Sequence, residues 1–276
     1  MVRSGALAVV RRGVYVEGPQ PDDAGARHAL LVRAAQGELD ASAVASHVSA
    51  AVIHGLPVWG VRLDVVQVTR PRRRSGARRS RRIHVHCAPL SADEVVLVDG
   101  LACTSLARTV VDMAREVQFE QAVVSTDAAL RRGLGRPALA AALDRVRGWP
   151  GAPDARRAVA FADDRSESPG ESRSRVAIAL AGLPPPALQW PVRYGGSTAY
   201  TDFAWVKQRT IGEFDGKVKY GRALRSGQDP GEVVYAEKLR EDAIRAQGWE
   251  VVRWRWADLG DFMPTAIVIR ERFRAG

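Results

Sequence analysis

The fold of the second half of the chain is decided by one stretch, YTDFAWVKQRTIGEFDGK, residues 200–217. Its two ends belong to two predicted strands, Ala199 to Trp205 and Arg209 to Lys219, paired antiparallel through a turn near Lys207-Gln208. Because successive side chains of a strand point to opposite faces, Glu213, Asp215 and Lys217 should share one face. Pairing of the two strands would bring Asp202 beside that row.

The elements expected around this stretch follow the order helix, three strands, helix, strand, helix. They are a helix over 171–180, strands over 188–194, 199–205 and 209–219, a helix over 233–247, a strand over 250–254 and a closing helix. Three consecutive prolines at 184–186 end the first helix. The PD-(D/E)xK nucleases have the same core order. By analogy we expect an α/β (α+β) restriction-endonuclease-like domain over 165–276.

The acids of this stretch predict a metal site. Carboxylates packed closely repel one another, so they take up protons or bind a cation, and oxygen ligands favour Mg²⁺. We therefore consider Asp202, Glu213 and Asp215 as metal ligands, with Lys217 or Lys219 stabilising charge during phosphodiester hydrolysis. The alternative is a solvated strand face whose lysine and glutamate form cross-strand pairs.

Several motifs of the second half resemble a known family. They are Glu171-Ser172-Arg173, Gly182-Leu183-Pro184-Pro185-Pro186, Gln189, Asp202-Phe203-Ala204-Trp205, Gly212-Glu213-Phe214-Asp215-Gly216, Arg240 to Asp242, and Gly248-Trp249-Glu250-Val251-Val252-Arg253. Together they resemble the actinobacterial domains related to very-short-patch-repair (Vsr-like) endonucleases. The resemblance implies a metal site of Glu171, Asp202, Glu213 and Asp215. Relatives often carry a histidine where this chain has Lys219, and Asp215-Gly216-Lys217 offers a second register, so the choice between Lys217 and Lys219 stays open.

The first half is expected to hold a strand hairpin, a small sheet and several helices. The expected strands are a hairpin within Ala6–Val16, then Val65–Thr69, Ile83–Cys87, Val95–Val98 and Leu101–Cys103. The expected helices cover 27–36, 42–54, 104–115, 119–130 and 137–147. Breaks at 148–153 and 166–170 predict the domain boundary in that interval.

Motifs in this half resemble the AbiEi-type antitoxins. They are the stretch from Ala45 to Leu56, Val68-Thr69-Arg70, and the stretch from Gly100 to Asp112. In that family a winged helix-turn-helix precedes an α/β domain, and the protein regulates transcription beside a cognate toxin. The resemblance implies a wing remnant over 1–20 and an α/β domain over 21–150. Since the sequence begins at the wing, we expect that it is truncated or that the recognition helices were lost.

Most of the net charge of +10 lies in one segment. Eight arginines and no acid occur between residues 70 and 82; they are Arg70, Arg72, Arg73, Arg74, Arg78, Arg79, Arg81 and Arg82. Guanidinium groups offer bidentate donors to phosphate, so this segment predicts salt-dependent binding of DNA. The alternative is a solvated loop.

Other residue types indicate little chemistry. His47 and His54 lie on one expected helix face, and His84 and His86 on one strand face, and we interpret all four as surface or capping residues. The two cysteines are expected to be reduced and buried. No apolar run could cross a membrane, no secretory signal is evident, and no small-molecule cofactor is indicated, so a cytoplasmic location is expected.

The sequence leaves two functional hypotheses. One is a DNA-associated protein whose nuclease-like domain is a Mg²⁺-dependent endodeoxyribonuclease. The other is a non-catalytic antitoxin or transcriptional regulator that binds DNA without cleaving it. A role on RNA is a third reading, because charge alone does not choose the nucleic acid.

Overall fold

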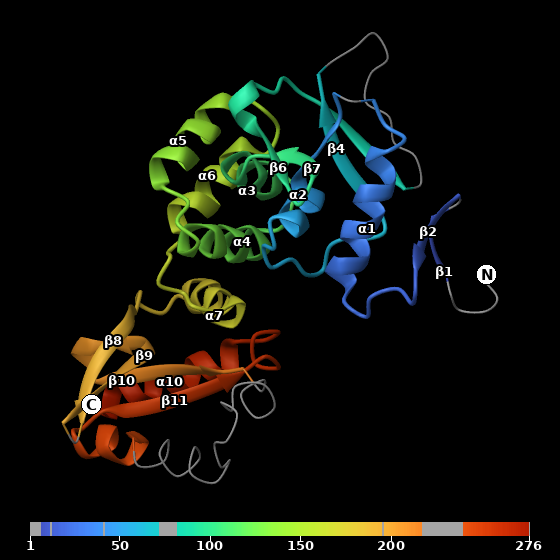
Figure 1. The fold of residues 1–276 in the computed structure, drawn as a ribbon. Helices are drawn as coiled ribbons and strands as arrows, with labels where there is room; N and C mark the ends of the chain where they lie inside the picture. The colour runs from blue at the N-terminus through green and yellow to red at the C-terminus, as the bar shows by residue number, and fades with distance from the viewer. Residues whose placement is uncertain are drawn as a thin grey trace. The chain divides into compact units, whose positions relative to one another are not determined.

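The computed structural model describes residues 7–11, 13–40, 42–71, 82–194, 196–216 and 240–275. The chain divides into two compact units, Met1–Ala162 and Asp163–Gly276 (Figure 1). Both units mix helices with sheets, as expected for an α+β protein. In the part of the chain that the structure describes, no helix combines the length and the apolar character needed to span a bilayer.

The first unit opens with the expected hairpin. Strands β1 (Leu7–Arg11) and β2 (Val14–Glu17) pair antiparallel, and helix α1 (Ala24–Gln36) follows. Asp23 caps this helix by accepting a hydrogen bond from the backbone N–H of Ala26, so the helix begins before the expected Arg27.

A five-stranded mixed sheet forms the centre of the first unit, in the order β5-β4-β3-β7-β6. Its strands are β3 (Val44–Ala45), β4 (Val66–Arg70), β5 (Ile83–Cys87), β6 (Val95–Val98) and β7 (Leu101–Thr104). Helices α1 and α2 (His47–Ile53) share a core with this sheet, which includes Val32, Ala50 and Val68.

The expected helix from Ser42 is wrong at its start. Val44 and Ala45 form a strand that pairs with β4 on one side and β7 on the other, and α2 begins at His47. A stretch of two residues is too short to show the periodicity of a helix or of a strand. Their conformation is set by the neighbouring strands, which override the helical pattern.

Four helices complete the first unit (Figure 1). They are α3 (Leu106–Ala114), α4 (Phe119–Arg131), α5 (Arg136–Arg145) and α6 (Ala152–Phe161). Ser105 caps α3, as its position predicts, by accepting from the N–H of Arg108.

The second unit is a four-stranded sheet, in the order β11-β10-β9-β8, with helices on both faces. Helix α7 (Pro169–Leu180) leads into strands β8 (Ala187–Tyr194), β9 (Ser197–Trp205) and β10 (Thr210–Asp215). These strands form an antiparallel meander, whereas β11 (Glu250–Arg255) lies parallel to β10. Residues 240–246 are helical, and α10 (Met263–Ala275) closes the chain.

The alternation of side chains separates two cores in this unit. Phe203, Phe214 and Trp254 face α7 and α10, where they pack with Ile178 and Ile269. The opposite face of the same sheet packs Val192 and Ile211 against Ile244 of the helix at 240–246. A Cβ on Gly170 would lie 1.9 Å from the Phe214 ring, so the start of α7 is pressed against β10 and needs glycine.

Candidate functional site

Glu171 lies in the first turn of α7 and is held by that helix start. Its Oε1 accepts from the Ser168 hydroxyl at 2.7 Å, and its Oε2 accepts from the backbone N–H of Glu167 at 2.8 Å. Ser168 in turn accepts from the N–H of Glu171, which makes a reciprocal cap. Gln189 of β8 also donates to Glu171, at 3.3 Å. The carboxylate is therefore tied to the helix cap and to the sheet edge.

Gln189 has an unusual backbone for a strand residue. Its φ of 51° lies in the left-handed region, which costs a non-glycine residue about 1–3 kcal/mol. On either side the pairing with β9 is regular, Leu188 opposite Phe203 and Trp190 opposite Thr201. Strain of this kind concentrates at functional sites, and here it directs the amide toward Glu171.

Asp202 lies where the pairing of β9 and β10 ends. The ladder runs from Trp205 opposite Thr210 to Phe203 opposite Gly212. One step further, the Asp202 Oδ2 accepts from the backbone N–H of Phe214 at 2.8 Å. The side chain thus takes the place of a backbone acceptor, and the predicted approach of Asp202 to the β10 row is confirmed.

Glu213 and Asp215 point away from the Phe214 face, as the alternation predicts, and both meet arginines. Glu213 binds Arg240 at 2.7 Å and Arg253, its neighbour in register on β11, at 3.1 Å. Asp215 lies 3.6 Å from Arg255, which is likewise its register partner. The acidic row is therefore matched by a basic row on β11.

These acids do not form a Mg²⁺ site as they lie. Their oxygen donors suit the ion, but no three of the four bring ligand atoms within 4.8 Å of one another in the described residues. Asp202 is engaged by a backbone N–H, and Glu213 by two guanidinium groups. Lys217 and Lys219 lie outside the residues that the structure describes, so their part in the site stays a prediction.

Six of the eight arginines of the basic segment also lie outside the described residues; they are Arg72, Arg73, Arg74, Arg78, Arg79 and Arg81. The other two, Arg70 and Arg82, stand at the ends of the parallel strands β4 and β5. The backbone oxygen of Arg82 accepts from the N–H of Val66, and that of Arg70 from the N–H of Ala88. The basic segment therefore connects two neighbouring strands of the sheet, β4 and β5.

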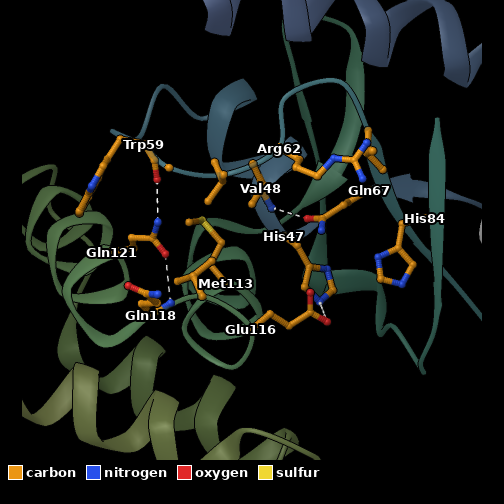
Figure 2. Close-up of a pocket in the computed structure, with 14 residues that line it drawn as sticks. His47, Val48, Trp59, Arg62, Gln67, His84, Met113, Glu116, Gln118 and Gln121 are labelled. Carbon is orange, nitrogen blue, oxygen red and sulfur yellow. Dashed lines mark hydrogen bonds and ion pairs between the residues drawn. The ribbon is translucent and has the colours of Figure 1, made fainter. Parts of the chain in front are cut away.

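A second cluster of titratable side chains lies in the first unit. His47 opens α2, β5 places His84 and His86 on one face, and Glu116 follows α3. His47 Nε2 lies 3.5 Å and His86 Nδ1 3.4 Å from the same oxygen, Oε1 of Glu116. Figure 2 shows the Glu116 carboxylate against the His47 ring. Within the described residues this is the one trio of His, Cys, Asp or Glu with ligand atoms this close.

The two histidine rings of this trio are stacked and neutral. Their centroids are 3.6 Å apart with 14° between the planes, and the ring of His84 lies 4.0 Å from that of His86. Burial, together with the neighbouring His47 and His84, lowers the pKa of His86 to about 2. Burial and the positive charges of Arg115 and Arg108 lower the pKa of His47 well below its usual range.

The arginines beside the cluster are matched by acids. Arg108 binds Asp112 at 2.7 Å and Glu94 at 2.9 Å, and Arg115 binds Asp112 at 2.9 Å. These ion pairs offset the charges of Arg108 and Arg115, and Glu94 also lies 3.5 Å from Arg145. A cavity of about 780 Å³ opens on the cluster, lined by His47, His84 and Glu116 together with polar residues that include Arg62 and Gln67 (Figure 2).

Comparison with known proteins places the chain among mycobacterial relatives. Over 263 residues it is 30% identical to the uncharacterized protein Rv2248 of Mycobacterium tuberculosis strain H37Rv, covering 91% of this chain and 86% of the relative. The uncharacterized protein MT2308 of strain CDC 1551 matches with the same identity and coverage. The chain belongs to their family. No family model matches it.

For this member of the Rv2248 family, sequence reasoning located the acidic row and missed the histidine cluster. The interpretation of the histidines as surface or capping residues is wrong for His47, which is 3% exposed and has a φ of 50°. The signal available was the alternation of His84 and His86 in one strand. His47 and Glu116 come from separate segments, and only tertiary structure brings them to that strand.

Proposed function

We propose that the protein associates with DNA and that its second unit is a nuclease-like domain of the PD-(D/E)xK, Vsr-like type. The observation that carries this proposal is the sheet of the second unit. An antiparallel meander of β8, β9 and β10 joined to a parallel β11, with helices on both faces, agrees with the core order expected for that type. Asp202 and Glu213 lie on the adjacent strands where that type carries its acids.

The strained Gln189 supports the same assignment. It lies opposite Asp202 in the register of β8 and β9 and donates to Glu171, so it links the start of α7 to the strand beside Asp202. A buried carboxylate held by a helix cap and an amide is costly to desolvate. Such an arrangement is typical of a site that the fold maintains for chemistry or for binding.

Contact with nucleic acid rests on the basic segment of the first unit. Its arginines are planar, permanently charged donors suited to phosphate. The AbiEi-like motifs of the same unit favour a regulator that binds DNA. We therefore propose that the whole chain acts as a DNA-binding regulator, and that a cognate toxin is its protein partner.

A second candidate function is DNA binding without cleavage. It is favoured by the ion pairs of Glu213 with Arg240 and Arg253 and by the approach of Arg255 to Asp215. Arginines beside the acids supply the charge that a metal would otherwise supply. In this reading the row is a structural remnant of a nuclease site.

Cleavage of supercoiled and linear DNA with Mg²⁺ or Mn²⁺ tests the two candidates. Wild-type protein would be compared with the Glu213→Ala, Asp215→Ala double variant and with Asp202→Asn, all purified identically. Asp163→Asn is a matched control, because Asp163 pairs with Arg165 and both residues lie outside the quoted motifs. Metal-dependent cleavage that is lost in the motif variants and retained by the control would establish a nuclease.

The opposite result is equally informative. If wild-type and variants bind DNA equally and neither cuts it, the second unit is nuclease-derived without being a nuclease. If the wild-type protein does not bind DNA at low salt, association with DNA itself is wrong. Duplex DNA and structured RNA compared at one salt concentration would identify the preferred nucleic acid.

A further inference from the structure

The trio of His47, His86 and Glu116 has the spacing of a metal site. Zinc binds imidazole nitrogen and carboxylate oxygen at about 2.0–2.2 Å in a tetrahedron, which puts neighbouring ligand atoms roughly 3.3–3.5 Å apart. The two observed nitrogen-to-oxygen distances are 3.5 Å from His47 and 3.4 Å from His86. Two imidazoles and one carboxylate are also a ligand set that proteins use for zinc.

The surroundings orient one of the two imidazoles, whereas, among the described residues, the Nε2 of His86 is buried without a hydrogen-bond partner. The other ring nitrogen of His47, Nδ1, lies 3.0 Å from the hydroxyl of the buried Ser46, which fixes the orientation of the ring. Burial lowers the pKa of both imidazoles, which favours the neutral form that coordinates. Each imidazole donates its lone pair in its own plane, so binding one ion requires the stacked rings to tilt apart.

The charge around the trio is compatible with a cation. Arg108 and Arg115, two positive groups near the trio, are both paired with the buried Asp112. Arg108 is paired with Glu94 as well. The carboxylate of Glu116, which lies against both imidazoles, brings a negative charge to the position of the ion.

The cavity beside the trio provides room for a fourth ligand. His47 and Glu116 line its wall, and it is about 780 Å³ in volume (Figure 2). Zinc sites with three protein ligands keep their fourth position for water or substrate. We propose that His47, His86 and Glu116 bind a divalent transition-metal ion of the zinc class, with its open position facing this cavity. The site is separate from the acidic row of the second unit.

The proposal is tested on the full chain, purified without a polyhistidine tag and freed of metal by a chelator. Zn²⁺ binding would be measured by calorimetry, and Co²⁺ binding by its visible absorption. We expect one ion per chain, and we expect excess Mg²⁺ to leave this binding unchanged, since Mg²⁺ prefers an all-oxygen shell. No binding of Zn²⁺ or Co²⁺ to the wild-type protein would overturn the proposal.

Variants decide whether the trio is the site. His86→Ala and Glu116→Gln should weaken Zn²⁺ binding by more than about 100-fold, and Ser46→Ala by roughly 10- to 100-fold, as for loss of a group that orients a ligand. His54→Ala is the matched control, because His54 ends α2 outside the trio and bonds to the backbone oxygen of Thr104. Asp202→Asn should also retain Zn²⁺, which separates this site from the acidic row.

The Glu116 variant keeps the test decisive. Glu116 is exposed, so Glu116→Gln should fold even if His86→Ala does not, and the thermal unfolding of each metal-free variant would establish this. Zn²⁺ affinity unchanged in a folded Glu116→Gln, or lost equally in His54→Ala, would overturn the assignment.

Discussion

At the scale of single residues, the first unit depends on polar groups that are buried with their partners. His28 of α1 is fully buried, and its Nδ1 lies 2.7 Å from the backbone oxygen of Leu63. A carbonyl can only accept, so Nδ1 carries the proton and Nε2 accepts from the hydroxyl of Ser49 at 2.9 Å. Ser49 accepts in turn from the N–H of Gln67. The chain of bonds fixes a neutral imidazole between α1, α2 and β4.

This arrangement predicts a loss of stability in acid. Burial lowers the pKa of His28 below its ordinary value of 6.5, so the unfolded chain takes up the proton more readily. The free energy of unfolding should therefore be fully retained above pH 6.5 and fall as the pH drops below it. His28 contributes a slope of up to about 1.4 kcal/mol per pH unit until the folded pKa is reached.

Urea unfolding of wild-type and His28→Gln protein at pH 7, 6 and 5, with chelator present, measures that contribution. The variant should be less stable at pH 7, and its stability should fall less steeply toward pH 5. The other histidines are the same in both proteins, so the difference between the two profiles isolates His28. Parallel profiles would show that burial of this imidazole is not linked to protonation.

At the scale of elements, β10 and β11 set acids against arginines. The parallel register places Arg253 beside Glu213 and Arg255 beside Asp215. Glu213 also meets Arg240 from the helix at 240–246, and its side chain is 13% exposed. Glu213 is partly buried and has two guanidinium partners, whereas Asp215 has one longer and more solvated ion pair. The Glu213 pairs should therefore stabilise the unit more.

We expect Glu213→Gln to lower the free energy of unfolding by about 1–3 kcal/mol, because it removes charged hydrogen bonds and leaves Arg240 less well compensated. Asp215→Asn, on the same face of the same strand, should change it by less than about 1 kcal/mol. Urea unfolding in metal-free buffer measures both. If Glu213→Gln instead raises the free energy of unfolding, repulsion between Glu213 and the neighbouring carboxylates outweighs its ion pairs. Such a destabilising row would be one retained for function.

These elements show how far sequence reasoning reaches. The alternation in residues 210–215 predicted which side of β10 carries the acids, and the three prolines predicted the end of α7. The arginine partners of the acids were missed, because a parallel register depends on the crossover and not on a local pattern. Strand β3 and the histidine trio were missed for the same reason. They depend on contacts between elements that are far apart in the sequence.

At the scale of the whole molecule, each unit has a core of its own. Val32, Val68 and Val85 belong to the core of the first unit, and Phe203 and Trp254 to that of the second. The division falls between Ala162 and Asp163. Fragments 1–162 and 163–276 should therefore fold separately, since a domain with its own core can do so in principle.

The fragments allow the binding of DNA to be assigned to one unit. All eight arginines of the basic segment belong to 1–162, so this fragment should bind duplex DNA with an affinity that falls steeply with salt. Each phosphate contact adds about 0.9 to the slope of log affinity against log salt.

Replacing the six arginines between 72 and 81 with serine should reduce that slope by up to roughly 5. Replacing them with lysine should largely keep the slope, because lysine retains the charge. The slopes are measured by fluorescence anisotropy of labelled duplex DNA. The affinity is determined at salt concentrations from about 50 to about 300 mM, the range over which phosphate contacts weaken. If 163–276 carries the salt-dependent affinity instead, the phosphate contacts lie beside the arginines of β11, and the acidic row belongs to a DNA-binding face.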